Sequence, residues 1–223
     1  MLRLNRSLLT LSIAAALCLG VSAGSTAADG ASLSPLSRAA SAPQLLALRA
    51  GIFDPRVGVA ASTNFAGAKD GRYAIVQFEA GEDASAARLR LGRQGHTVVA
   101  FVPNNAYAVR LGAGGLASLA TDNAVRWVGA YASEWKVDPL SRPVFEGATE
   151  FRNDLEVEGF AGESAARFAA ALRKSMPEAE VLNLREDANH PRLRVRVPSL
   201  KYQEAVVALS RIDGVLWIAP FVE

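Results

Sequence analysis

The sequence predicts an α+β protein made of two tandem ferredoxin-like domains, each a four-stranded antiparallel sheet with two helices on one face. The first observation is an internal repeat, because the segment AVRWVGAY at 124–131 is matched by GVLWIAPF at 214–221. The second is that apolar positions correspond further back, in the pairs Val109/Val195, Val98/Val181, Leu116/Val206, Leu119/Leu209 and Leu89/Leu172. The third is the order strand–helix–strand–strand–helix–strand, which is read in both copies. A repeat fixes the number of folding units, so two similar domains are expected.

In the first copy, the β-rich run at 73–78 predicts the opening strand. Residues 83–94 predict a helix that ends at Gly95, with Ala84, Ala87, Leu89 and Leu91 on one face and arginines opposite. The remaining elements are strands at 97–102 and 106–111 joined by the turn Pro103-Asn104-Asn105, a helix at 115–121 and a strand at 125–131.

In the second copy, strands are expected at 154–157, 180–185, 193–197 and 215–221, and helices at 163–175 and 200–212. The strand at 193–197 alternates strictly between apolar residues and arginine, so one face meets a core and the arginines meet solvent. A domain of about 70 residues buries only about 60% of its unfolded surface. We therefore expect the open sheet faces to need cover from the other copy or from a partner.

The two ends and the middle of the chain have different compositions. Residues 1–28 are typical of a secretory signal, with Arg3 and Arg6 before an apolar run and Ala23 or Ala28 as cleavage points. Residues 29–72 read as a flexible leader in which 45–50 form one short helical turn stopped by Gly51. The domains are expected at 73–131 and 153–223. They are joined by a linker at 132–152, in which Trp135 and Phe145 pack on a domain.

Charge and cysteine content narrow the classes of function. Cys18 is the only cysteine and lies in the signal, with Leu17 before it instead of the small residue of a lipoprotein site. The mature chain is thus expected to be a secreted protein, extracellular or periplasmic, without disulfides, thiol chemistry or a membrane anchor. Loss of Arg3 and Arg6 leaves 22 of the 24 basic residues against 22 acidic ones. This balance gives no support for nucleic-acid binding.

Several motifs imitate functional sites. Residues 112–117 follow a strand and open a helix like a G-x-G-x-x-A dinucleotide loop, but the corresponding Pro198-Ser199 has no glycine, so no cofactor is expected. His96 and His190 are expected to be solvated loop residues and not metal ligands. Ser164 starts a helix and is expected to cap it, since the second glycine of a nucleophile elbow is missing.

Neither the carboxylate pairs nor the central strands of the expected sheets indicate a functional site. The spacings of Glu156/Glu158 and Glu178/Glu180 are typical of exposed faces rather than of an acid–base pair. RNA-recognition modules share the expected topology, but the central strands here lack their basic-glycine-aromatic run. We therefore expect no catalytic residues, no cofactor and no metal.

Five segments carry a resemblance to a known family. They are LRAGIFDP at 48–55, YAIVQF at 73–78, FVPNNAYAVRL at 101–111, VRWVGAY followed by Trp135-Lys136, and the closing GVLWIAPFVE. Over 45–223 the chain resembles the N-terminal pro-region of bacterial secreted subtilisin-like serine proteases, of the type with tandem propeptide-like domains. The Asp-Ser/Thr-Gly, His-Gly-Thr and Gly-Thr-Ser motifs of the catalytic domain do not occur.

The resemblance implies a non-enzymatic protein that assists folding of a subtilisin-like protease and temporarily inhibits it, in cis or in trans. In such pro-regions the sheet packs on helices of the enzyme, and a segment after the last strand enters the active-site cleft. Pro220, Phe221 and Glu223 are the matching docking residues, with little chain beyond them for a tail; residues 132–142 are long enough to serve as one. The chain is expected to be either a freestanding product or a fragment of a protease precursor. The alternatives are an autonomous extracellular adhesion or protein-interaction module and, third, a domain that binds small molecules between its sheets.

Overall fold

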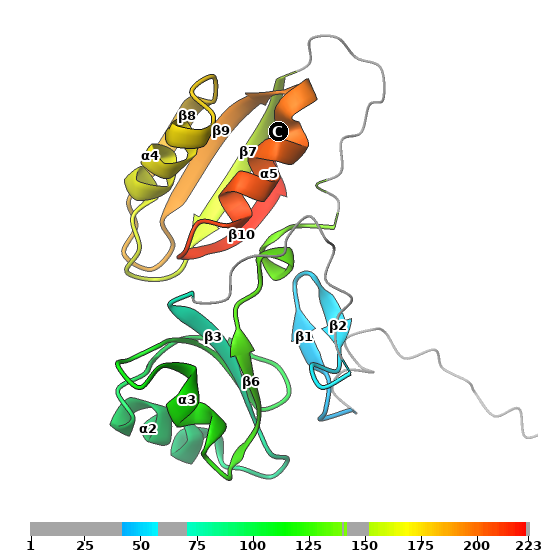
Figure 1. Ribbon diagram of the computed structural model, residues 1–223, viewed down its shortest axis with the longest axis vertical. Coiled ribbons are helices and arrows are strands. Elements are labelled where there is room, and N and C mark those ends of the chain that lie inside the picture. The colour runs from blue at the N-terminus through cyan, green and yellow to red at the C-terminus, as the bar shows by residue number, and fades with distance from the viewer. Residues whose placement is uncertain (1–41, 58–70, 140, 142–151, 222–223) are drawn as a thin grey trace, which may run out of the picture. The chain divides into compact units, whose positions relative to one another are not determined.

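A computed structural model describes residues 42–57, 71–139, 141 and 152–221 of the 223-residue chain (Figure 1). The predictions of a signal peptide at 1–28, of Phe145 as a packed residue and of Glu223 as a docking residue lie outside the described residues. All described residues belong to one compact unit.

Both predicted copies contain the expected strands and helices. The elements of the first repeat are β3 (Tyr73–Phe78), α2 (Ala84–Arg93), β4 (Thr97–Val102), β5 (Ala106–Arg110), α3 (Gly115–Ala120) and β6 (Val125–Ala130). Those of the second repeat are β7 (Arg152–Gly159), α4 (Ala165–Ser175), β8 (Glu180–Arg185), β9 (Arg192–Pro198), α5 (Tyr202–Ser210) and β10 (Val215–Pro220). Short additional elements are β1 (Leu46–Leu48), β2 (Gly51–Phe53), η2 (Ser133–Lys136) and η3 (Ser199–Lys201).

The protein is α+β, with one four-stranded antiparallel sheet in each repeat. The orders are β4-β5-β3-β6 and β10-β7-β9-β8, so the first and third strands of each repeat are central and the second and fourth are at the edges. Figure 1 shows α2 and α3 on one face of the first sheet, and α4 and α5 on one face of the second.

The two sheets also share their irregularities. Val98 pairs with Val109 and the register then shifts, just as Val181 pairs with Val195 before a shift in the second sheet. These are the correspondences Val98/Val181 and Val109/Val195 that the sequence predicted. The last strands shift in the same way, immediately after Val125 in one copy and after Val215 in the other. Repeated β-bulges at equivalent positions indicate that the two copies have the same local geometry.

The helix-side core of the first repeat corrects one detail of the repeat alignment. Ala87 and Leu91 are the buried residues of α2, whereas Leu89 is 62% exposed. Residues four apart lie on one helix face, while a residue two positions on lies on the opposite side. The prediction that Leu89 shares the apolar face and corresponds to the buried Leu172 is therefore wrong.

The opposite face of the first sheet is covered by the chain itself. Leu46 of β1 is fully buried there in one apolar cluster with Ile75, Ala108 and Trp135. The carbonyl of Leu45 accepts a hydrogen bond from Asn104 Nδ2 at 2.8 Å. The predicted helical turn at 45–50 is wrong: this segment pairs with β2 as a hairpin, and so this part of the expected flexible leader is a structured cover.

The start of the predicted linker is packed as well. Trp135 in η2 is buried, as predicted, with its ring centroid 5.4 Å from that of Phe53. Val137 forms a parallel bridge with Ile218, and the amide of Asp138 donates to the carbonyl of Ile218 at 2.9 Å. Residues 133–138 are therefore held in place, and the idea that this segment is a free tail is wrong for them.

Several contacts join the repeats. The rings of Tyr73 and Phe160 are stacked with centroids 4.2 Å apart. Arg72 Nε donates to Asp213 at 2.7 Å, and the Tyr73 hydroxyl donates to Glu163 at 2.6 Å. The Glu163 side chain is only 5% exposed. Stacked rings and a nearly buried carboxylate thus form a mixed apolar and polar contact between the two repeats.

Candidate protein-interaction surface

The second sheet presents charged residues on the face away from its helices. Alternation along β7 and β9 buries Leu155, Val157, Leu193 and their neighbours in the helix-side core. The opposite face carries the residues between them, which the register pairs as Asp154↔Arg196, Glu156↔Arg194 and Glu158↔Arg192. Each directly opposed pair joins one acid and one base, the arrangement that stabilises antiparallel strands. We call this surface the open face.

Asp154 is the most strongly bound carboxylate of the open face. Arg194 Nη2 donates to it at 2.6 Å and Arg196 Nε at 2.8 Å. Burial raises the pKa of Asp154, but the hydrogen bonds from Arg196 and Arg194 offset this and leave the pKa lowered. Two guanidinium groups thus hold one ionised carboxylate, which fixes the two arginine side chains in the middle of the sheet.

The other two carboxylates bind weaker or more distant partners. Glu156 accepts from Arg192 Nη1 at 3.2 Å. Glu158, whose side chain is 11% exposed, accepts from Arg49 at 2.9 Å and lies 3.1 Å from His190 Nδ1. Glu156 is partly exposed, whereas Glu158 is buried, so the prediction that this pair lies on an exposed face is wrong for Glu158.

Aromatic residues of β10 and of the chain just after it border these charges. The Arg194 guanidinium carbon lies 3.4 Å from the centroid of the Phe221 ring, and that of Arg49 lies 5.7 Å from the Trp217 ring. The Phe221 amide donates to the carbonyl of Asp154 at 2.9 Å and so continues the ladder past Pro220. Such contacts give a planar cation and an aromatic ring a defined mutual position.

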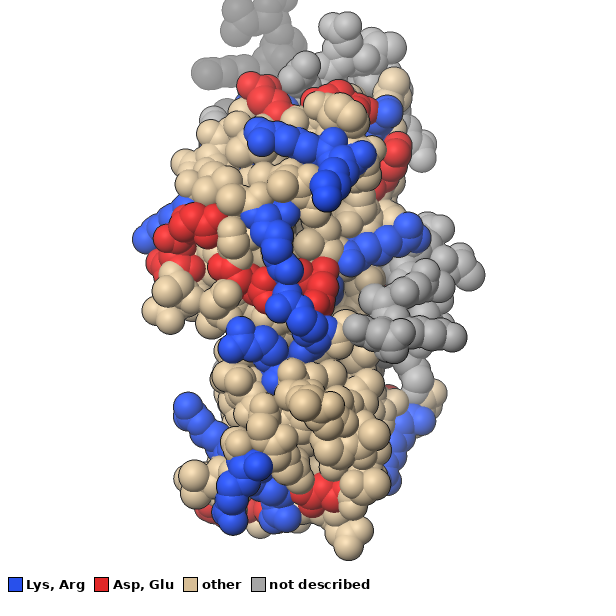
Figure 2. Space-filling model, turned by 60° about the vertical axis from the view of Figure 1, so that its left-hand side comes forward, with Lys and Arg blue, Asp and Glu red and all other residues tan. Residues whose placement is uncertain are grey.

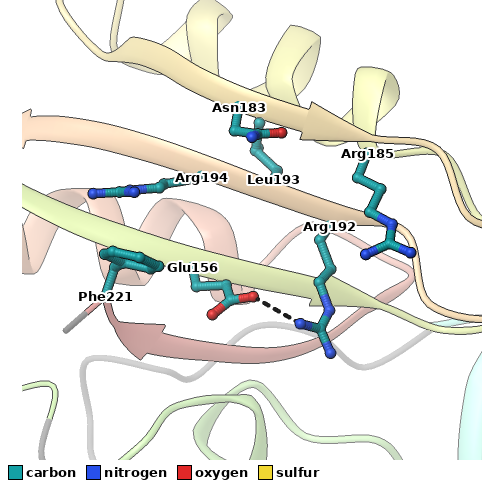
Figure 3. Close-up of a pocket in the computed structure, with 7 residues that line it drawn as sticks. All are labelled: Glu156, Asn183, Arg185, Arg192, Leu193, Arg194 and Phe221. Carbon is teal, nitrogen blue, oxygen red and sulfur yellow. Dashed lines mark hydrogen bonds and ion pairs between the residues drawn. The ribbon is translucent and has the colours of Figure 1, made fainter. Parts of the chain in front are cut away.

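A cavity of about 280 Å³ opens on this face. Figure 3 shows the residues that line it, which are Glu156, Asn183, Arg185, Arg192, Leu193, Arg194 and Phe221. Arg185 is 71% exposed at the side chain, and its ion pair with Asp187 spans 3.7 Å. On the face of the molecule in Figure 2, basic and acidic side chains lie beside one another and not in separate patches of one sign.

The structure brings only part of the predicted docking set to this surface. Phe221 is at the wall of the cavity, and Pro220 is paired with Leu155 at the end of β10. Arg185, Arg192 and Arg194 were not predicted to be site residues. The alternation of arginine in β9 was the signal that could have identified two of them.

The dinucleotide-like loop has a different structural role. A Cβ on Gly112 would lie 2.3 Å from the carbonyl oxygen of Gly95. The glycine is thus required by close approach of two backbone segments, which accounts for it without a phosphate. The following helix, α3, is only six residues long.

His96 is not the solvated residue that was predicted. It is 4% exposed, accepts from the Gly112 amide at Nδ1 and lies 3.0 Å from Ser118 Oγ through Nε2. Because Nδ1 accepts, the proton of the neutral ring is on Nε2, which donates to the serine. Burial lowers the pKa of His96. This tautomer cannot remove a proton from Ser118, so the pair is a structural contact and not a nucleophile with its base.

Other predicted roles are clear from hydrogen bonds. Ser164 is the N-cap of α4, as predicted, and accepts from the Arg167 amide. Glu186 also binds this helix end, where it accepts from the Ala166 amide at 2.8 Å.

Lys136 is buried next to the second repeat, with Nζ donating to the carbonyl of Ile212 at 3.1 Å. Burial lowers the pKa of Lys136 to about 8.

Within the described parts of the chain, no three histidine, cysteine or acidic residues are grouped so that they could hold a metal ion. Among the helices of the same residues, none combines the length and apolar character needed to cross a membrane.

Comparison with known proteins gives one match. A family model described as a domain of unknown function (DUF8729) matches residues 47–132. This range takes in most of the β1–β2 hairpin, the first sheet with its helices, and the residue after Tyr131, so the hairpin and the first repeat fall within a single matched region. No curated protein and no solved structure matched the chain.

Proposed function

We propose that the chain is a secreted, non-catalytic pro-region that assists folding of a subtilisin-like serine protease and temporarily inhibits it. In this proposal both repeats have the ferredoxin-like fold, and the protease catalytic domain is the partner, in cis or in trans. The proposal has its origin in the five sequence segments that resemble such pro-regions.

The observation that carries the proposal is the open face of the second sheet. Its helices lie on the other side, and its strands present charged and aromatic side chains beside a cavity. A small sheet with one face available is suited to bind a larger protein. Folding of the two would be coupled, because any partner that binds the native state stabilises it.

The two repeats would then have different tasks. The outer face of the first sheet is already covered by β1, β2 and η2, so it is not available to a partner. The second sheet is therefore the docking element, with Pro220 and Phe221 at the end of its edge strand as the nearest described residues to the active-site cleft. Glu223, the third predicted docking residue, lies outside the described residues.

The test uses the chain without residues 1–28 and a purified subtilisin-like protease. We expect the chain to raise the yield of active enzyme after dilution from denaturant, and to slow hydrolysis of a peptide substrate by the native enzyme. Ala219→Arg places a large cation on the open face, opposite Glu156, and should reduce both effects. Ala170→Arg, on the exposed side of α4, is the matched control. No effect on either refolding or hydrolysis would refute the proposal.

A second candidate is an autonomous extracellular protein-interaction module with no protease partner. It is favoured by the cover that β1, β2 and η2 form on the first sheet. The contacts between Tyr73 and Phe160 and between Arg72 and Asp213 also favour it. A chain with these contacts has less need of a partner to complete its core.

Unfolding in urea separates the two candidates. An autonomous module should unfold in one cooperative transition with the same midpoint with or without protease. A pro-region should show a second repeat that unfolds at lower urea alone and at higher urea once its protease is added.

A further inference from the structure

We propose that the cavity on the open face binds a carboxylate of an acidic, extended peptide segment of the partner, with Arg185 and Arg192 as its principal ligands. The inference deepens the proposed function, on which it rests, by naming the chemistry that the partner presents to the second sheet.

The geometry brings two guanidinium groups together from neighbouring strands. Arg185 ends β8, Arg192 begins β9, and the register places them directly opposite one another. Figure 3 shows both side chains reaching to the same side of the sheet, along the cavity. Two adjacent guanidinium groups can bind one carboxylate through several N–H donors in a planar arrangement.

The charge of the lining favours an anion. Three arginines and one glutamate line the cavity, an excess of two positive charges. The glutamate, Glu156, is bound to Arg192 at 3.2 Å, and Arg185 has only the distant 3.7 Å pair with Asp187 among the ion pairs of the described residues. The side chains of Arg185 and Arg192 are 71% and 50% exposed, so their donors are accessible from solvent.

The rest of the lining is held in position by its own contacts. Arg194 is fixed between Asp154, at 2.6 Å, and the Phe221 ring, at 3.4 Å from the ring centroid. Asn183 stands opposite Arg194 in the sheet. A site whose wall is already ordered loses less entropy when a ligand binds than a site that must first be formed.

The surroundings of the cavity favour an acidic peptide over a continuous polyanion. The carboxylates of Asp154 and Glu158 flank the same face, and they would repel a ligand that directs a charge toward the sheet at every step. An extended peptide directs only every second side chain toward the sheet, so even hexaglutamate can avoid these two carboxylates. Phe221 adds apolar surface at the cavity, which suits the aliphatic part of a glutamate side chain or a neighbouring apolar residue. The mature chain also has no excess of positive charge to attract nucleic acid.

Fluorescence anisotropy with a labelled hexaglutamate peptide tests the site in the full chain without residues 1–28. A hexaglutamine peptide of the same length is the ligand control. We compare the wild type with the double variant Arg185→Gln/Arg192→Gln and with Arg173→Gln/Lys174→Gln. The second variant removes the same charge from the exposed end of α4. Circular dichroism checks that all three proteins remain folded, and Arg185→Gln alone replaces the double variant if that does not fold.

We expect hexaglutamate to bind and hexaglutamine not to bind. The cavity variant should bind about tenfold more weakly or worse, because charge-assisted hydrogen bonds are lost, whereas the helix variant should match the wild type. The NMR signals of the Arg185 and Arg192 Nε–H groups should shift on titration. Equal weakening in both variants, absence of hexaglutamate binding, or tighter binding of a thymidine oligonucleotide to the same arginines would overturn the inference.

The protease assays distinguish this inference from the proposed function. If the chain assists refolding of the protease and hexaglutamate does not bind, the inferred carboxylate site is refuted and the pro-region proposal is retained. If hexaglutamate binds as expected and the chain has no effect on the protease, the inferred carboxylate site is retained and the pro-region proposal is refuted.

Discussion

The backbone of Gly112 lies against the backbone of Gly95, so closely that a Cβ on Gly112 would be 2.3 Å from the Gly95 carbonyl oxygen. Neither group can rotate away, because both belong to the main chain. We expect Gly112→Ala to lower the free energy of unfolding by about 1–3 kcal/mol, as overpacking does elsewhere. Urea unfolding followed by circular dichroism measures the change.

Gly92 provides the control for this substitution. It lies within α2, and a Cβ there would have no heavy atom within 4 Å. Gly92→Ala should therefore raise the free energy of unfolding by about 0.5–1 kcal/mol, since alanine favours the helix. A loss of stability in Gly92→Ala, or none in Gly112→Ala, would contradict the packing described for these glycines.

Trp135 is central to the cover on the first sheet. Its ring contacts Phe53 and Tyr131 in the buried cluster. Trp135→Ala should cost about 3–5 kcal/mol of stability, because a large buried ring leaves a cavity. It should also expose apolar surface, measured as increased fluorescence of an anilinonaphthalene dye. Trp217→Ala removes a partly exposed ring of the second repeat and should cost clearly less.

Asp154 should contribute stability only while it is ionised. Asp154→Asn leaves Arg194 and Arg196 without their shared carboxylate, and we expect a loss of about 1.5–3 kcal/mol at pH 7. Because the folded pKa is lowered, this stabilisation is present above the ordinary pKa of 3.8 and disappears as the pH falls through the lowered value. The stabilities of the two proteins in urea should therefore converge as the pH falls below this lowered pKa.

Glu156→Gln is the matched control on the same strand. Its carboxylate binds Arg192 at 3.2 Å on a more exposed part of the sheet. Exposed ion pairs contribute about 0–1 kcal/mol, so this variant should remain near the wild type at every pH. A larger loss of stability than that of Asp154→Asn would contradict the expectation that Asp154 contributes more to stability than Glu156.

Lys136 should destabilise the folded protein at neutral pH. Burial lowers its pKa to about 8 from the ordinary 10.5, so the unfolded chain holds more protons between these values and stability rises with pH across this window. Lys136→Met removes the buried charge and should raise the free energy of unfolding at pH 7 by about 1–2 kcal/mol. The gain should shrink towards pH 10.5. Lys174→Met, at the exposed end of α4, should show no such pH dependence.

The strands and helices of both repeats could be predicted because apolar periodicity decides them locally. The paired valines of the two sheets, Val98 with Val109 and Val181 with Val195, are where the repeat alignment placed them. The apolar pattern of β3 also indicates which sheet is covered on both faces. All six of its residues are buried, which is typical of a strand covered on both faces, whereas β9 alternates and leaves one face open.

Contacts between distant parts of the chain could not be predicted in the same way. Leu45 to Ala50 has helix-forming residues, and only burial of Leu46 against the first sheet makes this segment a strand. His96 lies in a connection, where solvent exposure is the usual case, but the Gly112 amide and Ser118 enclose it. The cavity of the open face has the same origin, since Arg185 and Arg192 meet only when β8 and β9 pair.

The hairpin β1–β2 acts on the first sheet as an intramolecular ligand. It is tethered to the sheet that it covers, so its effective concentration is set by chain length and not by the amount of protein in solution. Any partner of the second sheet that comes from another molecule must instead obey mass action. Dilution should therefore leave the first sheet covered, whereas it would release such a partner from the second.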